Sequence, residues 1–96
     1  MPRLIWTRTA QQAIARLHRF LADQDAAAAR RAIHSIRAGV NVLVRQPRLG
    51  RPVDDLDAAF REWLIDFGDS GYVVLYRVDD EAVTILTIRH QREVGY

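Results

Sequence analysis

The sequence predicts an α+β fold in which an N-terminal strand and a helical hairpin pack on a small antiparallel sheet, in the order β-α-α-β-β-β. Two successive stretches repeat apolar residues every three or four positions, which is typical of amphipathic helices. Three later runs rich in Val, Ile, Leu, Thr and Tyr are separated by turn-forming residues, which indicates strands. Because the two patterns are segregated along the chain, helices and sheet form separate layers.

The N-terminal half predicts one strand and two helices. Residues 2–6 form a short apolar strand, and Thr9 lies three residues before Gln12, as in a capping box. The first helix carries its apolar stripe at Ala10, Ala13, Ile14, Leu17, Phe20 and Leu21. Asp25 is a suitable N-cap for a second helix, whose apolar side is Ala29, Ile33, Ile36, Val40 and Leu43. The connection is so short that the helices form an antiparallel hairpin.

The C-terminal half predicts a loop and a meander of three strands. Residues 47–59 contain Pro, Gly and Asp in a pattern typical of a loop, and strands follow at residues 61–67, 72–78 and 82–89. Alternation places Trp63 and Ile65 on one face of the sheet and Leu64 on the other. Since both faces hold apolar side chains, we expect helices on one face and a partner surface on the other. Alternatively, the second face is a homodimer surface or is covered by the C-terminal tail.

Charge and residue usage exclude several classes of mechanism. The chain has 14 basic and 12 acidic residues, but residues 1–53 hold ten Arg against two Asp, and residues 54–96 hold four Arg against ten acids. Every basic residue is Arg, so a Lys Schiff base and a P-loop are excluded, and the lack of Cys excludes a thiolate nucleophile and disulfides. We expect a single domain over residues 1–96, with no membrane segment and a cytoplasmic location.

Three histidines are the first candidates for chemistry, because His titrates near neutral pH without help from its surroundings. His18 and His34 lie on the Arg-bearing flanks of the helices, where we expect them to be solvated. His90 lies between Arg89 and Arg92, where two guanidinium groups would flank its ring, and it suits either general acid–base catalysis or a structural hydrogen bond. No pair of His, Asp or Glu has ligand spacing on a shared element, so we expect no metal and no other cofactor.

Arginines are the second set of candidates, because a guanidinium binds phosphate or carboxylate through two parallel hydrogen bonds. One cluster surrounds the loop, and the other comes from the strands and the tail: Arg45, Arg48 and Arg51, then Arg61, Arg77, Arg89 and Arg92. These residues suit a basic groove for RNA or for an acidic protein. Alternatively, they are solvated charges in a protein that uses Arg in place of Lys.

The order and spacing of several segments resemble the RelE/ParE superfamily of bacterial toxin–antitoxin toxins. The segments are LIWT at residues 4–7, LVRQP at 43–47, LGRPV at 49–53, REWL at 61–64, YVVLYR at 72–77 and VTIL at 83–86, followed by Arg89 and His90. The resemblance spans nearly all 96 residues. It implies a RelE/ParE-like fold and a plasmid-stabilisation type of toxin that arrests growth and is neutralised by an antitoxin wrapping around it.

Two departures from the RelE-like branch bear on the mechanism that the resemblance implies. That branch resembles ribosome-dependent mRNA endonucleases and typically has Arg directly after the Gly-Tyr of the second meander strand, where this chain has Val73. The loop position after Gly50-Arg51-Pro52 is also apolar, at Val53. The chain therefore looks more like the ParE-like branch, whose members include DNA gyrase poisons. A ribosome-dependent nuclease and a surface-binding domain without toxicity remain as alternatives.

The resemblance also implies roles for individual residues and partners. A nuclease would have to use an improvised catalytic set of His90, Arg61, Arg89, Arg92 and Tyr96. Contacts to the cellular target, gyrase or ribosome, are expected from Arg77, Arg89, His90 and Arg92. Contacts to a cognate antitoxin are expected from Arg45, Arg51, Trp63 and Tyr76. An acidic, amphipathic antitoxin tail suits these residues and would form a hetero-oligomer with the toxin.

Overall fold

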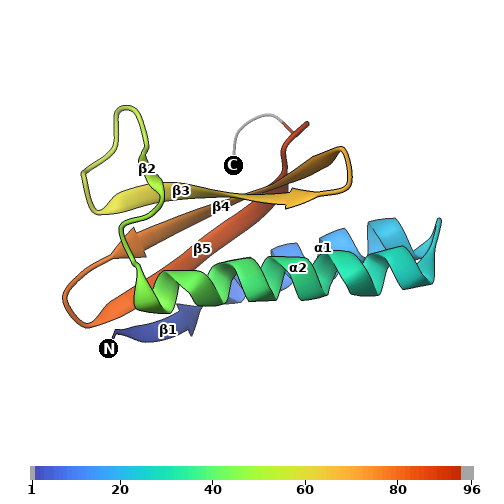
Figure 1. The fold of residues 1–96 in the computed structure, drawn as a ribbon, viewed down its shortest axis with the longest axis horizontal. Helices are drawn as coiled ribbons and strands as arrows, with labels where there is room; N and C mark the ends of the chain where they lie inside the picture. The colour runs from blue at the N-terminus through green and yellow to red at the C-terminus, as the bar shows by residue number, and fades with distance from the viewer. Residues whose placement is uncertain (1, 94–96) are drawn as a thin grey trace.

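The computed structural model describes residues 2–93 and contains two helices and five strands (Figure 1). Strand β1 (Arg3–Trp6) leads into α1 (Arg8–Ala22) and α2 (Ala26–Arg45), which form the predicted hairpin. The chain continues through β2 (Arg51–Pro52), β3 (Phe60–Phe67), β4 (Ser70–Val78) and β5 (Ala82–His90). The predicted fold class and order of elements are confirmed, with β2 as an addition inside the predicted loop.

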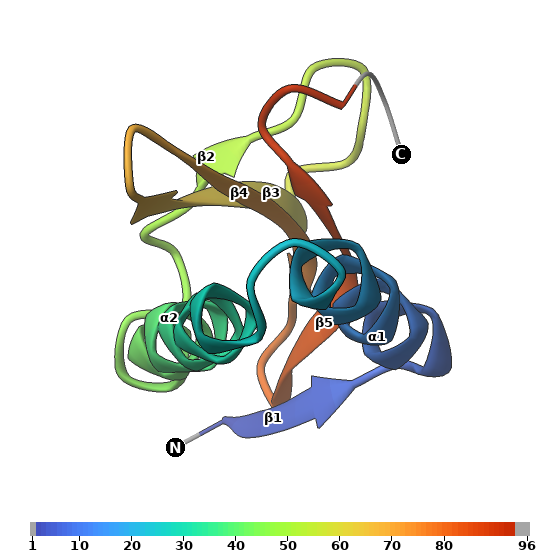
Figure 2. The same cartoon turned by 90° about the vertical axis from the view of Figure 1, so that its right-hand side faces the viewer.

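The sheet has the strand order β1-β5-β4-β3-β2. Strands β2 to β5 pair antiparallel, whereas β1 pairs parallel with β5, with Leu4 opposite Val83. The sheet is therefore mixed, and β1 extends the meander. Figure 2 shows both helices against one face of the strongly curved sheet, with α1 beside β5 and α2 below β3 and β4.

Side-chain caps fix where the two helices begin. Thr7 is the N-cap of α1, and its Oγ1 accepts a hydrogen bond from the Ala10 backbone N–H at 3.1 Å. The prediction of a cap at Thr9 was wrong, because Thr9 already lies inside the helix. Asp25 caps α2 as predicted, and its carboxylate accepts from the backbone N–H groups of Ala27 and Ala28.

The core lies between the helices and the facing side chains of the sheet, such as Ile65, Val74 and Ile85. Gly39 of α2 sits directly above Ile65, because a Cβ at Gly39 would lie 2.8 Å from the Ile65 Cδ1 and Cγ1 atoms. The Trp63 indole N–H also donates to the Gly39 carbonyl at 3.0 Å. Gly39 therefore allows α2 to pack closely against Ile65 of β3, which a side chain at this position would obstruct.

An irregularity in β5 decides which face of the sheet holds His90. The β4–β5 register runs from Leu75 opposite Thr87 to Tyr76 opposite Ile85, so that Leu86 is skipped. Beyond the shift, His90 pairs with Tyr72 and shares the helix-facing side of the sheet with it. Strict alternation from Ile85 would have placed His90 on the opposite face.

The opposite face of the sheet is only partly exposed. Leu64 is 42% exposed there, Leu75 is half-buried, and Val73 is 3% exposed. The expected apolar partner surface on this face is therefore reduced to a small area around Leu64. Trp63 and Tyr76, in contrast, face the core.

Candidate functional site

A groove between α1, the start of β4 and the end of β5 is lined by two of the candidate residues, His90 and Arg92. We call it the sheet groove, and its lining residues are Arg16, Leu17, Phe20, Leu21, Gln24, Tyr72, His90, Arg92 and Glu93. Phe20 is 56% exposed at its edge, although the sequence pattern assigned Phe20 to the buried stripe of α1. That prediction was wrong, because the buried face of α1 consists of Ala10, Ala13, Ile14 and Leu17.

Both ring nitrogens of His90 are already engaged within the protein. The Arg92 backbone N–H donates to Nδ1 at 3.1 Å, and Nε2 lies 3.1 Å from the Ser70 Oγ. Since a backbone N–H only donates, Nδ1 is an unprotonated acceptor, and the neutral ring carries its proton on Nε2. Nε2–H therefore donates to Ser70, which leaves no free ring nitrogen to act as a general base and does not activate the Ser70 hydroxyl as a nucleophile.

The surroundings of His90 differ from the expected pair of guanidinium groups. Its ring meets the Tyr72 ring edge-on, with centroids 5.5 Å apart and an interplanar angle of 87°. Arg92 reaches His90 through its backbone, while Arg89 pairs with Val73 on the other face of the sheet. His90 thus has the structural hydrogen bonds that were one of its two predicted roles.

Two arginines, one from α1 and one from β5, hold the turn after β5 in place. The Arg16 guanidinium donates to both Glu93 carboxylate oxygens, at 3.0 and 3.3 Å. The Arg89 Nη1 donates to the Glu93 carbonyl at 2.7 Å. Both partners of the Arg16–Glu93 pair are well exposed, so this pair contributes on the order of 0–1 kcal/mol to stability. Its main effect is to hold one wall of the sheet groove against α1.

Arg61 lies far from His90. Arg61 pairs with Tyr76 and His90 with Tyr72, four residues apart on β4, which corresponds to about 13 Å along the strand. The two residues are also on strands that flank β4 on opposite sides. The Arg61 Nη1 donates to the carbonyls of Gly50 and Arg48, at 2.7 and 3.2 Å. The structure therefore does not bring the predicted nuclease residues around one point, and Tyr96 lies outside the described residues.

The predicted target-binding residues are also spread over two places, one at each end of β4. His90 and Arg92 line the sheet groove, and Arg89 supports the adjoining turn from the other face. Arg77 lies at the opposite end of β4, opposite Thr84, and forms an exposed ion pair with Asp79 at 3.1 Å. Backbone hydrogen bonds from Glu81 and Ala82, and then Arg77, lower the pKa of the Asp79 carboxyl. Arg77 is therefore part of the β4–β5 turn and not of the sheet groove.

The predicted antitoxin-binding residues gather near the end of α2 and the following loop, but they differ in exposure. Arg45 is exposed, Arg51 pairs with Glu62 at 3.2 Å, and Trp63 is half-buried. Tyr76 is 0% exposed, which contradicts the prediction that it contacts a partner. Its hydroxyl instead accepts from the Gly50 backbone N–H at 2.9 Å and donates to the Pro47 carbonyl at 2.7 Å, so it anchors the loop to the sheet.

Replacing this phenol is expected to destabilise the fold and to change its response to alkali. Tyr76→Phe leaves the Gly50 N–H and the Pro47 carbonyl without their partner, which costs about 1–3 kcal/mol at pH 7. Burial raises the pKa of the Tyr76 hydroxyl, against the opposing effects of the Gly50 hydrogen bond, Arg61 and Arg48. The measurement is the urea midpoint of both proteins at neutral and alkaline pH.

The sign of the pH effect follows from the raised pKa. The folded protein holds the Tyr76 proton more tightly than the unfolded chain, whose tyrosines titrate near pH ~10. The stability that this provides is present below that pH and is lost as the pH rises toward the folded pKa. Tyr76→Phe therefore loses less stability in alkali than the native chain, in which burial also raises the pKa of Tyr72. Equal alkaline losses in both proteins would contradict this role for Tyr76.

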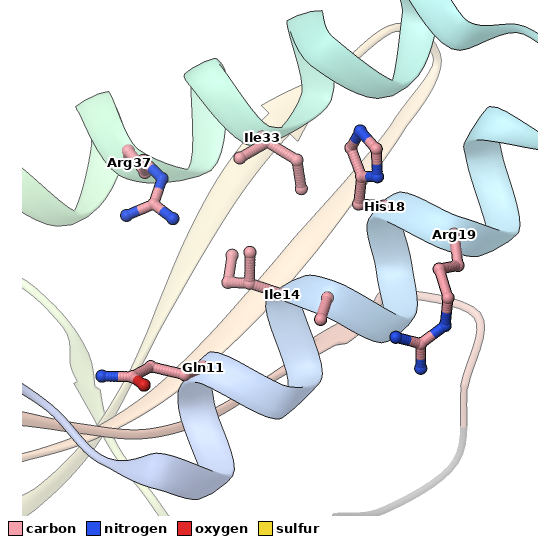
Figure 3. A pocket seen from close by; sticks show the side chains of 7 residues that line it. Gln11, Ile14, His18, Arg19, Ile33 and Arg37 are labelled. Atoms are coloured by element: carbon pink, nitrogen blue, oxygen red, sulfur yellow. The ribbon is translucent and has the colours of Figure 1, made fainter.

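A second, shallower groove lies between the two helices (Figure 3). We call it the hairpin groove, and its lining residues are Gln11, Ile14, Ala15, His18, Arg19, Ile33 and Arg37. His18 is exposed here and His34 is exposed elsewhere on α2, so both predictions of solvated histidines are confirmed. The Arg37 guanidinium lies 5.5 Å from the centroid of the Trp6 ring, in a cation–π contact that joins α2 to β1.

The part of the chain that the structure describes has neither a metal-binding cluster nor a membrane-spanning helix. Within residues 2–93, no three His, Asp or Glu side chains gather in an arrangement that would hold a metal ion. Neither helix of this part combines the length and the apolar character needed to cross a bilayer.

Phe20 of the sheet groove and Ser70, the hydrogen-bond partner of His90, were not predicted as functional residues from the sequence. Phe20 was assigned to the core, because helical spacing alone does not tell how far the buried stripe extends. Ser70 was part of a turn signal and had no local feature that linked it to His90, which is 20 residues away. Their roles depend on the pairing of β4 with β5.

Comparisons with known proteins find relatives both in sequence and in fold. The family model described as the ParE toxin of the type II toxin-antitoxin system, parDE, matches residues 4–95. Toxin RelE3 of Caulobacter vibrioides is 37% identical over 84 residues, which cover 88% of each chain. A structure of the chromosomal ParDE system from P. aeruginosa has a TM-score of 0.78 at 22% identity, covering 94% of this chain and 96% of that one. The RelBE2 toxin-antitoxin complex from Mycobacterium tuberculosis has a TM-score of 0.67 at 25% identity, covering 95% and 100%.

Proposed function

The chain belongs to the ParE toxin family of type II toxin–antitoxin systems, within the RelE/ParE superfamily, and from this premise we propose that it arrests growth by binding an essential target rather than by cleaving RNA. Inhibition of the DNA gyrase type is the favoured mechanism. Residues 1–96 act as a single toxin domain in the cytoplasm, and the partner that neutralises it is a cognate antitoxin.

The arrangement of His90 and Arg61 carries the proposal against RNA cleavage. Cleavage through the 2′-hydroxyl needs a base for that hydroxyl, cations for the phosphorane and an acid for the leaving oxygen, all around one phosphate. Both ring nitrogens of His90 form hydrogen bonds within the protein. Arg61 lies about 13 Å away along the strand direction and is bound to loop carbonyls. A binding mechanism does not require these groups to converge.

Val73 supports the same proposal. It occupies the position after Gly71-Tyr72 where the resemblance implies Arg in a RelE-like nuclease, and its side chain is 3% exposed. Val53 is the second apolar replacement, and it lies in the loop after β2. Neither side chain can provide the positive charge that stabilises a phosphorane.

The sheet groove is the surface that we propose the antitoxin covers. Its floor of Leu17, Leu21 and Tyr72 and its exposed Phe20 suit the apolar face of an amphipathic helix. Arg16 and Arg92 at the same groove suit the acidic side chains of such a helix. The groove therefore replaces the cluster around Tyr76 as the proposed centre of the antitoxin interface.

The function is tested by assaying the purified toxin on two targets in parallel. We expect inhibition of DNA supercoiling by gyrase and no cleavage of ribosome-bound mRNA, and induction in cells is expected to raise a DNA-damage response with intact transcripts. Arg31→Ala is a matched control for Arg61→Ala, because Arg31 is an exposed Arg of α2 outside both grooves.

A ribosome-dependent mRNA endonuclease is the second candidate, because His90 and Arg92 meet at the sheet groove. Cleavage of ribosome-bound mRNA that disappears in His90→Ala or Arg61→Ala, but persists in Arg31→Ala, would establish this candidate and refute gyrase-type inhibition. Growth that continues normally on induction would refute both and favour a binding domain without toxicity.

A further inference from the structure

One side of α2 presents a row of polar side chains, of which only Arg37 also lines the hairpin groove. We call this row the α2 stripe, and it consists of Arg30, His34, Arg37, Asn41 and Arg45. The intervals of four, three, four and four residues place these side chains on one side of the helix. All five are exposed.

The positive charge of the stripe is not neutralised by neighbouring acids. Neither α1 nor α2 contains an Asp or Glu, although the two helices together carry seven Arg. Within residues 2–93, the ion pairs of the structure involve Arg16, Arg51 and Arg77, and none involves an Arg of α2. The Trp6 ring orients the Arg37 guanidinium and leaves its charge in place.

The chemistry of the stripe fits a phosphate backbone better than a peptide. An amphipathic helix needs an apolar strip to pack on, and the stripe offers only guanidinium, imidazole and amide groups. Guanidinium and amide groups are among the usual donors to phosphate oxygens in complexes with DNA. The sheet groove, with its exposed Phe20, provides the apolar surface that a helical partner needs.

The spacing of the arginines matches duplex DNA. At a rise of about 1.5 Å per residue, Arg30 and Arg37 are ~10.5 Å apart along the helix axis, and Arg37 and Arg45 are ~12 Å apart. The major groove of B-form DNA is about 12 Å wide. Neighbouring arginines of the stripe can therefore meet the phosphates on the two sides of one major groove.

From the α2 stripe we propose that the helical layer of this toxin binds the phosphate backbone of duplex DNA without sequence preference, through Arg30, Arg37 and Arg45. The binding adds an electrostatic contact to DNA that is separate from the toxin's action on its cellular target. It does not depend on whether that target is gyrase or the ribosome.

The test measures the salt dependence of binding to a labelled DNA duplex of mixed sequence by fluorescence anisotropy. Each lost phosphate contact lowers the slope of log K against log salt by about 0.9, so Arg30→Gln/Arg37→Gln/Arg45→Gln lowers it by ~2.7. When the salt rises from ~50 to ~200 mM, the affinity of the native protein for DNA is therefore expected to fall about 40-fold more than the affinity of the variant. Gln preserves helix propensity, and circular dichroism and the thermal midpoint verify that the variant is folded.

The matched control removes the same charge elsewhere. Arg16→Gln/Arg51→Gln/Arg77→Gln removes three exposed arginines that are paired with carboxylates, and its slope is expected to change by less than about 1. A second variant, Arg30→Gln/Arg45→Gln, keeps the Arg37–Trp6 contact and is expected to lower the slope by about 1.8. Equal slopes in the two triple variants would overturn the proposal, since binding would then follow net charge alone. Binding of polyglutamate or single-stranded RNA that is tighter than binding of the duplex and is lost in the stripe variant would also overturn it.

Discussion

Gly50→Ala is expected to lower the free energy of unfolding by about 3 kcal/mol, which corresponds to ~12–24 °C in Tm for a domain of this size. A Cβ at Gly50 would lie 2.5 Å from the Tyr76 hydroxyl oxygen and 2.6 Å from the Glu62 carbonyl oxygen. The Glu62 carbonyl belongs to β3 and cannot move without disturbing the sheet. The Tyr76 ring is fully buried and has no room to withdraw. Thermal unfolding followed by circular dichroism measures the effect.

Gly68→Ala is the matched control for this loss of stability. Gly68 has a positive φ of 62° and no heavy atom within 4 Å of a Cβ, so its substitution costs only the backbone strain, on the order of 1–2 kcal/mol. A double variant with Tyr76→Phe removes one of the clashing atoms at Gly50, and its loss is expected to be smaller than the sum of the two single losses. If Gly50→Ala is no more destabilising than Gly68→Ala, the loop is not held against the sheet as described.

Phe20→Glu is expected to weaken antitoxin binding at least about 30-fold, or ~2 kcal/mol, which is the loss typical of a large aromatic residue at the centre of an interface. Phe20 is the most exposed large apolar side chain of the sheet groove, and a carboxylate there also repels the acidic residues expected of the antitoxin. Because the side chain is exposed, the toxin's own stability changes by only about 0.5 kcal/mol. Calorimetric titration of the toxin with its antitoxin gives the affinity.

The control for Phe20 is Leu56→Glu, since Leu56 is 50% exposed but lies in the loop, outside the sheet groove. Its affinity for the antitoxin is expected to be close to that of the native chain. In cells, the antitoxin is expected to rescue growth from the Leu56 variant and not from the Phe20 variant. Equal affinities for the two variants would place the antitoxin on a different surface.

Local pattern predicted most of the fold because each helix and strand has a clear hydrophobic periodicity. The apolar side of α2, the cap at Asp25 and the turns around residues 68–71 and 79–81 are all local features, and the structure confirms them. β2 was not predicted, because a strand of two residues has no periodicity and exists only through its pairing with β3. The Thr9 error has a similar cause, since Thr7 and Thr9 are both suitable caps and the contact of Thr7 with β5 selects between them.

The candidate site was less predictable, because it depends on which residues of β3, β4 and β5 lie opposite one another. The sequence identified His90, Arg89 and Arg92 as neighbours along the chain, but the shift at Leu86 decided that His90 faces the helices. The same register pairs His90 with Tyr72 and leaves Arg61 opposite Tyr76, at the other end of β4. The family resemblance also implied that Tyr76 meets a partner, whereas its hydroxyl is buried against the loop.

Residue identity and local periodicity were enough to predict the order of the elements, the exclusion of Lys and Cys chemistry and the concentration of Arg in the helical half. The tertiary structure was needed to show that His90 uses both ring nitrogens internally, that Phe20 is exposed at the sheet groove and that no ion pair within residues 2–93 involves an Arg of α2. The physical reason is that these properties depend on strand register and on contacts between residues far apart in the chain. A local pattern of hydrophobicity does not encode such contacts.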